Sequence, residues 1–102
     1  MSEPKAKFSA DASLDLAEIF EHIQADSPDA ARRVVSSILE KAAQLATAPQ
    51  MGRARSNLRK DARSYCVGTY VVFYEITHSG IGVLRVLHGA RNPRPLLRNS
   101  DR

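Results

Sequence analysis

The sequence predicts an α+β domain in which an N-terminal helical hairpin packs on an antiparallel sheet, in the order strand, helix, helix, strand, strand, strand. Two neighbouring segments between residues 11 and 47 place apolar residues at helical spacing, and three segments between residues 63 and 88 are rich in Val, Ile, Tyr and Phe. One layer of helices on one face of a sheet is the natural architecture for this order. The 102 residues have the size of one ordinary domain, so we expect a single domain over residues 1–102.

A short strand and a helix are expected first. Residues 5–8 contain one strong β former, Phe8, which favours a brief strand. Asp11 or Ser13 can accept hydrogen bonds from the free N–H groups of a helix start, and Asp15 suits the positive end of the helix. We expect this helix to end near Asp26. The apolar residues that share one of its faces are Leu16, Ile19, Phe20 and Ile23.

The second helix is predicted to run from Ser27 to about Thr47. Ser27 suits the cap, and Pro28 suits the first helical position, where its missing N–H costs nothing. Pro49 and Gly52 do not suit a continuing helix. The tight turn makes the two helices antiparallel, with their apolar faces toward a shared core. The apolar positions of the second helix are Ala31, Val34, Val35, Ile38, Ala42 and Leu45.

The rest of the chain alternates between turns and strands. Residues 50–62 look like an exposed connection, because large apolar side chains are few there and basic ones are frequent. Strands are expected over residues 63–67, 70–77 and 81–88, and the short Gly-containing turns between them predict an antiparallel meander. Two prolines, at positions 93 and 95, then end regular pairing and leave a basic C-terminal tail over about residues 92–102.

The charge is distributed unevenly along the chain. The net charge is +4, but residues 1–50 hold five Lys/Arg against eight Asp/Glu, whereas residues 51–102 hold ten against three. The second half is therefore seven charges positive, and nine of its ten cations are arginine. Arginine binds carboxylate and phosphate through paired donors. Composition thus predicts an acidic partner, either nucleic acid or an acidic protein segment.

Composition also limits the classes of function. No apolar run approaches the roughly 18 residues that a membrane helix needs, and no apolar block of signal-peptide type follows the N-terminus. We therefore expect a cytoplasmic protein with no membrane partner. Cys66 is the sole cysteine, so an internal disulfide is excluded, and we expect it to be a small core residue. No Cys/His cluster has metal-ligand spacing, so we expect no metal and no cofactor.

Several local sequences, in their order and spacing, resemble the ParE branch of the RelE/ParE toxin superfamily. The resemblance spans roughly residues 8–91. It rests on DLAEI in the first helix (15–19), on LATAPQMG at the end of the second (45–52), and on the strand segments RSYCVGTYVVFY (63–74) and IGVLRVLHGAR (81–91). The resemblance implies the fold predicted above and a toxin of a type II toxin–antitoxin system, of the kind associated with plasmid stabilization.

For ParE-type members the resemblance implies inhibition of DNA gyrase by binding, without enzymatic activity of the toxin. The target-binding candidates are then the basic connection and the C-terminal segment. They are Arg53, Arg55, Arg59, Lys60, Arg91, Arg94 and Arg98.

For RelE-type members the resemblance implies ribosome-dependent mRNA cleavage by a metal-independent endonuclease. Activating the 2′-hydroxyl and stabilising the transition state require proton carriers and cations. The candidates here are Arg63, Arg85, His88 and Arg91. The RelE branch usually carries a C-terminal tyrosine, and no aromatic residue follows Tyr74, which favours the gyrase hypothesis. A third possibility is an inactive member that acts only in a DNA-binding repressor complex with its antitoxin.

The resemblance also implies a hetero-oligomer with a ParD-like antitoxin that has an acidic C-terminal segment, and contact with DNA only through that complex. We expect the antitoxin to dock in an apolar groove between the helical hairpin and the sheet that includes Leu16, Phe20 and Val35. Arg63 and Arg85 would pair with its acidic side chains. The alternative that the three apolar residues are simply core stays open, because a small domain has few apolar side chains to spare.

Overall fold

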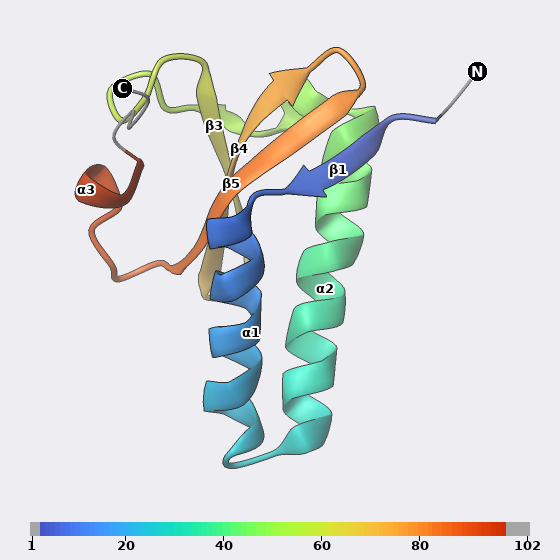
Figure 1. Ribbon diagram of the computed structural model, residues 1–102, viewed down its shortest axis with the longest axis vertical. Coiled ribbons are helices and arrows are strands. Elements are labelled where there is room, and N and C mark those ends of the chain that lie inside the picture. The colour runs from blue at the N-terminus through green and yellow to red at the C-terminus, as the bar shows by residue number, and fades with distance from the viewer. Residues whose placement is uncertain (1–2, 98–102) are drawn as a thin grey trace.

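The computed structural model describes residues 3–97, and in this part of the chain a helical hairpin covers one face of a five-stranded sheet (Figure 1). In chain order the elements are β1 (Lys5–Phe8), α1 (Ala10–Gln24), α2 (Pro28–Thr47), the 3₁₀ turn η1 (Pro49–Met51), β2 (Arg53–Ala54), β3 (Ala62–Val67), β4 (Tyr70–Thr77), β5 (Gly80–His88) and α3 (Arg94–Leu97). The strand order across the sheet is β1-β5-β4-β3-β2. The predicted fold class is confirmed.

The first strand and the start of α1 are joined to β5. β1 pairs with β5 in parallel, so the sheet is mixed rather than wholly antiparallel as predicted. The helix cap is Ser9, not Asp11 or Ser13, because Ser9 Oγ accepts a hydrogen bond from the Ala12 N–H. Ser9 also donates its backbone N–H to the Val83 carbonyl oxygen and its hydroxyl to the Leu84 carbonyl oxygen. The long-range bonds to β5 therefore decide where β1 ends and α1 begins.

The second helix matches its prediction. Ser27 caps α2 by accepting a hydrogen bond from the Ala30 N–H, and Pro28 occupies the first helical position. α1 ends at Gln24, two residues before the predicted end, and α2 ends at Thr47 as predicted. The helices run antiparallel along one face of the sheet (Figure 1). The buried residues between the helices and the sheet include Ala12, Ile19, Ile38, Ala42, Leu45, Val72, Tyr74, Ile81, Val83 and Val86.

The three predicted strands form the expected meander, with one irregularity. β3 pairs antiparallel with β4, and β4 pairs antiparallel with β5. The register between β4 and β5 shifts at Phe73/Tyr74, where Leu84 is an extra residue on β5. This bulge follows from no local sequence signal, because it depends on the pairing of two strands.

The connection over residues 50–62, which was predicted only as an exposed connection, contains regular structure. It contains η1 and the two-residue strand β2, which pairs with Arg63 and Ser64 of β3. These pairings attach the end of α2 to the edge of the sheet. The basic side chains of the connection are therefore carried on hydrogen-bonded backbone.

The second face of the sheet has its own small apolar cluster, in which the C-terminal segment takes part. Phe73, Leu87 and Leu97 are buried there, with Leu58 and Leu96 packed against them. Part of the predicted basic tail is therefore a packed helical turn, α3, rather than a free extension. Residues 98–102, which include the candidate Arg98, lie outside the described residues.

The sole cysteine is not where the sequence predicted it. Cys66 is exposed, so the prediction of a core position is wrong. Tyr65 and Val67 turn toward the helices, and strand alternation directs the residue between them to the other face.

No helix in the described residues 3–97 is long and apolar enough to cross a membrane.

Candidate functional site

The arginine-rich connection and α3 meet at one surface. We call this surface the basic face. Its residues are Arg53, Arg55, Arg59 and Lys60 of the connection and Arg94 of α3. Arg94 Nη1 donates to the Asn57 carbonyl oxygen across 3.4 Å, which links two segments that lie 37 residues apart. Both were predicted as target-binding segments, and the structure brings them together.

The backbone of the connection holds these side chains in a compact turn. Arg55 donates its N–H to the Ala62 carbonyl oxygen at 2.8 Å, and its own carbonyl oxygen accepts from Leu58 and Arg59. Asp61 closes the turn in the left-handed region, with φ of 63°, which aspartate tolerates better than most residues. The turn thus returns the chain to β3 immediately after the last basic residue.

The cations of the basic face differ in how strongly they are held. The Arg55 guanidinium lies 5.6 Å from the centre of the Phe73 ring and donates to Ser64 Oγ at 3.2 Å. Arg59 lies 4.0 Å from a Glu75 carboxylate oxygen. Arg53 and Lys60 are exposed. Contacts with the sheet hold Arg55 and Arg59 in place. Arg53 and Lys60 are therefore the cations best able to contact an incoming acidic surface.

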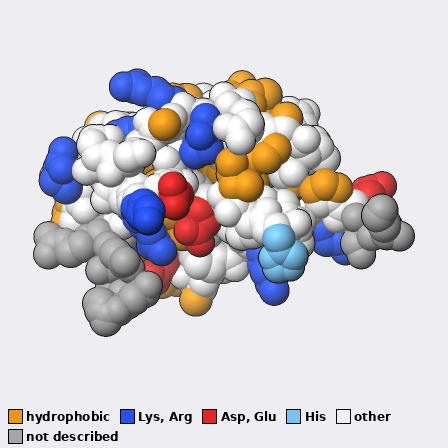
Figure 2. Space-filling model, turned by 90° about the horizontal axis from the view of Figure 1, so that it is seen from above, with side chains coloured by type: hydrophobic (Ala, Val, Ile, Leu, Met, Phe, Trp, Pro, Cys, Tyr) orange, Lys and Arg blue, Asp and Glu red, His pale blue; other side chains and the backbone are white. Residues whose placement is uncertain are grey.

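Two large apolar side chains are exposed beside β2. Met51, in η1, is 44% exposed, and Ile76, near the end of β4, is 41% exposed. Ile76 lines a small hollow together with Ala54 and Arg63. In Figure 2, which looks onto the end of the molecule where the connection and the β4–β5 turn lie, positive side chains surround a few acidic ones, with hydrophobic side chains beside them. Ile76 was not among the predicted site residues, because the sequence showed it only as part of the strand expected over residues 70–77.

A buried tyrosine fixes the start of the connection. The Tyr74 hydroxyl accepts a hydrogen bond from the Gly52 N–H at 2.9 Å and donates to the Pro49 carbonyl oxygen at 2.7 Å. Arg63 adds two bonds, from Nε to the Gly52 carbonyl oxygen and from Nη2 to the Gln50 carbonyl oxygen. Together they attach the end of α2 and η1 to the sheet, and so position Met51 and the first basic residues.

Replacing Gly52 with alanine is expected to destabilise the fold by about 1–3 kcal/mol, the usual cost of overpacking. An added Cβ would lie 2.2 Å from Tyr74 Oη, so the tyrosine must move and lose its two bonds. The backbone is extended there (φ −78°, ψ 160°), which alanine adopts freely. Gly82→Ala is the matched control, because the nearest atom to its added Cβ lies 3.7 Å away. Urea unfolding of both variants measures the difference, and equal stability would contradict the assigned role of Tyr74.

Arg63 and Arg85, which were also predicted as site residues, make hydrogen bonds within the molecule. Arg85 Nε and Nη2 donate to the two carboxylate oxygens of Asp15 at 2.8 and 2.7 Å. The hydrogen bond to Asp15 raises the pKa of Arg85 above its ordinary value. Arg63, as described above, is bonded to the carbonyl oxygens of η1 and Gly52. Neither guanidinium is therefore presented freely at the surface.

The comparison with protein families places the chain. A family model described as the ParE toxin of the type II toxin–antitoxin system parDE matches residues 6–93. The chain belongs to the ParE toxin family. Among curated proteins, none matches the chain at a significant level.

Two solved structures share the fold of this ParE family member. The chromosomal ParDE toxin–antitoxin system of P. aeruginosa matches with a TM-score of 0.70 and 20% identity, over 83% of this chain and 95% of that one. The RelBE2 toxin–antitoxin complex of Mycobacterium tuberculosis matches with a TM-score of 0.67 and 25% identity, over 89% and 97%. The RelE/ParE-like fold is thus shown independently of the family model.

The structure separates the RelE-type nuclease candidates in this ParE family member. His88 and Arg91 are exposed and line a hollow between α1 and the end of β5, together with Tyr70 and His22. The His88 ring stands edge-on to the Tyr70 ring, and its Nδ1 accepts from the Ala90 N–H. Arg63 lies at the other end of the molecule, beside η1. Arg91, also predicted to bind the target, is likewise not part of the basic face.

The predicted antitoxin-contact residues are partly shielded from solvent. Leu16, Phe20 and Val35 are all half-buried. Leu16 lies one turn from both Ala12 and Ile19, on the same face of α1, and packs against the core that contains them. None of the three lines the groove between α2 and the β3–β4 turn. Contact between these residues and an antitoxin stays a prediction.

Proposed function

We propose that this ParE family member is the toxin of a type II toxin–antitoxin pair, that it acts in the cytoplasm by binding and inhibiting DNA gyrase, and that a ParD-like antitoxin neutralises it. The observation that carries the proposal is the composition of the basic face. Arginines from two distant segments meet there, and two exposed apolar side chains, Met51 and Ile76, lie near the same connection, beside β2. Apolar anchors with an arginine rim are typical of a protein-binding surface.

The distribution of the cations supports binding over catalysis. Arg63 and Arg85 hold the fold together through the Gly52 carbonyl oxygen and Asp15. A nuclease site needs its proton carriers and cations around one phosphate, whereas His88 and Arg91 are separated from Arg63. An RNA-cleaving mechanism therefore has less support here than inhibition by contact.

An antitoxin partner is supported by the relatives. The RelBE2 structure is a toxin–antitoxin complex, and the matched family is that of the ParE toxin of the parDE system. By analogy, this chain is expected to form a hetero-oligomer with its antitoxin, and any contact with DNA is expected to come through that complex.

Gyrase inhibition is expected to depend on the exposed pair of the basic face. In a supercoiling assay with purified gyrase, Arg53→Glu combined with Lys60→Glu should raise the half-inhibitory concentration by about tenfold or more, because repulsion replaces attraction at an acidic surface. The antitoxin should restore supercoiling by the wild-type mixture. The measurement is the toxin concentration that halves the rate of supercoiling.

The matched control reverses the same number of charges elsewhere. Arg32→Glu combined with Lys5→Glu changes two exposed cations, on α2 and on β1, and should leave inhibition within about twofold, since exposed charges far from a contact are screened. The same preparations are incubated with mRNA on programmed ribosomes. Cleavage of mRNA with unaffected gyrase would overturn the proposal and make His88 and Arg91 catalytic candidates.

A further inference from the structure

One exposed face of α1 combines an apolar side chain with carboxylates. Leu14 is 57% exposed, more than any other large hydrophobic side chain in residues 3–97. Asp11, Glu18 and Glu21 are exposed as well, and their spacing places them with Leu14 on one stripe of the helix. The proposed function gives this acidic stripe no role. An exposed leucine between carboxylates fits a partner that offers an apolar recess with cations beside it.

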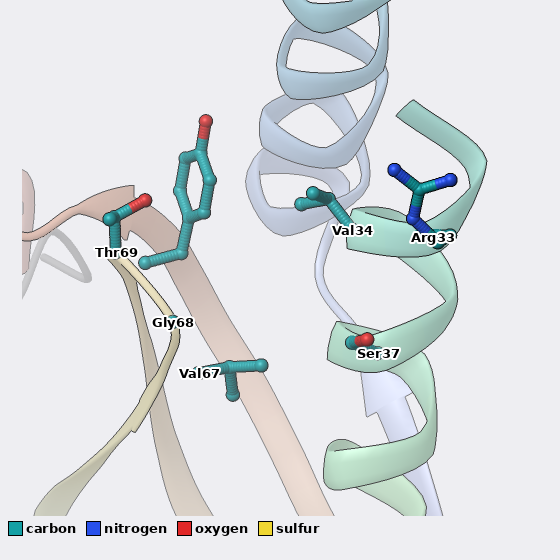
Figure 3. A pocket seen from close by; sticks show the side chains of 7 residues that line it. Arg33, Val34, Ser37, Val67, Gly68 and Thr69 are labelled. Carbon is teal, nitrogen blue, oxygen red and sulfur yellow. The ribbon is translucent and has the colours of Figure 1, made fainter. Parts of the chain in front are cut away.

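The chain itself has such a recess between α2 and the β3–β4 turn. Figure 3 shows Val34 and Ser37 of α2 facing Val67 and Thr69 across this groove. The half-buried side chains of Val34, Val67 and Tyr70 provide an apolar floor. No residue of α1 lines the groove, so Leu14 of the same chain does not fill it. The groove has a volume of about 380 Å³ and is lined by Arg33, Val34, Ser37, Val67, Gly68, Thr69 and Tyr70.

Two cations of α2 beside the groove match the spacing of two carboxylates on α1. Arg33 is exposed and lines the groove, and the Lys41 ammonium lies 5.1 Å from the centre of a tyrosine ring of β3. These positions are eight residues apart, which is about 12 Å along a helix. Asp11 and Glu18, with Leu14 between them, are seven residues apart, or about 10.5 Å. No carboxylate is among the residues that line the groove, so nothing there repels the acidic stripe.

From this match of shape, charge and spacing, we infer that α1 of one copy of the chain docks along α2 of a second copy and inserts Leu14 into its groove. The two carboxylates that flank Leu14 then lie beside the two cations of the second copy's α2. An amphipathic helix in an apolar groove is a common mode of recognition. The inference does not rest on the proposed function, because none of these residues belongs to the basic face.

The contact is heterologous, because a helix of one copy meets a groove of the other. Each copy therefore offers its groove to one neighbour and its α1 stripe to another, and repeated contacts extend head to tail unless they close into a ring. Exposed ion pairs add little free energy, and a single leucine anchor buries a small area. The association is therefore expected to be weak and reversible.

The test is sedimentation equilibrium of the purified chain at increasing concentration. The weight-average mass of the wild type is expected to rise above that of the monomer as the concentration approaches about 1 mM. Leu14→Asp removes the anchor, and Ser37→Trp fills the groove from an exposed helix position. Each should weaken self-association by about tenfold or more. The matched controls are Leu39→Asp, at another exposed leucine, and Ser36→Trp, which should both associate within about twofold of the wild type.

A mixture of the two disabled variants provides a second measurement. Leu14→Asp keeps an intact groove and Ser37→Trp keeps an intact α1 stripe, so an equimolar mixture should form dimers of one copy of each and nothing longer. Such dimers would also show that both variants are folded. A monomeric wild type, self-association of either variant at the wild-type level, or a mixture that stays monomeric would overturn the inference. Neither gyrase nor any other protein enters these measurements, so failure of the proposed function is detected separately.

Discussion

Replacing Asp15 with alanine is expected to lower the free energy of unfolding by about 3–5 kcal/mol, the usual cost of leaving one partner of a buried ion pair alone. The Asp15 side chain is 5% exposed and that of Arg85 is 15% exposed. Asp15 accepts two hydrogen bonds from Arg85 and a third, at 2.9 Å, from the Val86 N–H. The truncation leaves both the guanidinium and that N–H without their acceptor.

The position of Asp15 in the fold explains why the effect should be large. β1 pairs with β5 only as far as Phe8 and Val83, and the chain then turns into α1 at Ser9. The rest of β5 would have an unpaired edge, whose backbone groups are costly to bury unsatisfied. The Asp15 carboxylate takes the place of the missing strand at Val86. The residue therefore joins α1 to the sheet.

Urea unfolding followed by far-ultraviolet circular dichroism measures the change. Glu18→Ala, an exposed carboxylate one turn further along α1, is the control and should stay within about 0.5 kcal/mol of wild type. The Asp15→Ala, Arg85→Ala double variant should lose about 0.5–3 kcal/mol less than the sum of the two single variants. A loss below about 1 kcal/mol for Asp15→Ala would show that the pair contributes little.

The sequence predicted those parts of the fold that local signals determine. Ser27 and Pro28 are adjacent and carry both the cap and the first position of α2, so the start of that helix was predictable. The strands of the meander are dense in β-branched and aromatic residues and are separated by short turns. In contrast, the parallel pairing of β1 and the bulge at Phe73/Tyr74 depend on residues about 75 and 11 positions away in the chain, which no local pattern encodes.

The long-range contacts of the site could not be predicted from local sequence patterns either. The arginines of the connection were evident as a basic segment, but nothing in the sequence near Arg85 indicates its partner 70 residues earlier. Asp15 looked like a charge placed for the helix end, whereas its actual role is the long-range pair with Arg85. Residue type alone therefore does not distinguish arginines that hold the fold from arginines that are exposed. Only the three-dimensional pairing separates Arg53 and Lys60, which are exposed, from Arg63 and Arg85, which hold the fold.

Gly80→Ala is expected to detach β1 from the sheet and to lower the free energy of unfolding by about 3 kcal/mol or more, because backbone strain and overpacking each cost about 1–3 kcal/mol. Gly80 has φ of +143°, and an added Cβ would lie 2.0 Å from the Lys5 carbonyl oxygen. The obstacle is backbone, so no side-chain rotation relieves it. Since Lys5 pairs with Gly80 and its N–H bonds to the Ser79 carbonyl oxygen, the clash lies at the first contact of β1 with β5.

Gly68→Ala is the control for Gly80→Ala, because it places alanine at a positive φ without a steric clash. Gly68 has φ of +60° and no atom within 4 Å of an added Cβ, so its substitution should cost only about 1–2 kcal/mol, the penalty of a left-handed conformation. Hydrogen exchange at the Ser9 amide, which bonds to the Val83 carbonyl oxygen, reports whether β1 stays in place. We expect rapid exchange in Gly80→Ala and protection in Gly68→Ala. Because Ser9 also caps α1, loss of this protection would extend to the start of the helix, whereas equal protection in both variants would mean that the sheet accommodates the alanine and that β1 is held by α2 rather than by its pairing with β5.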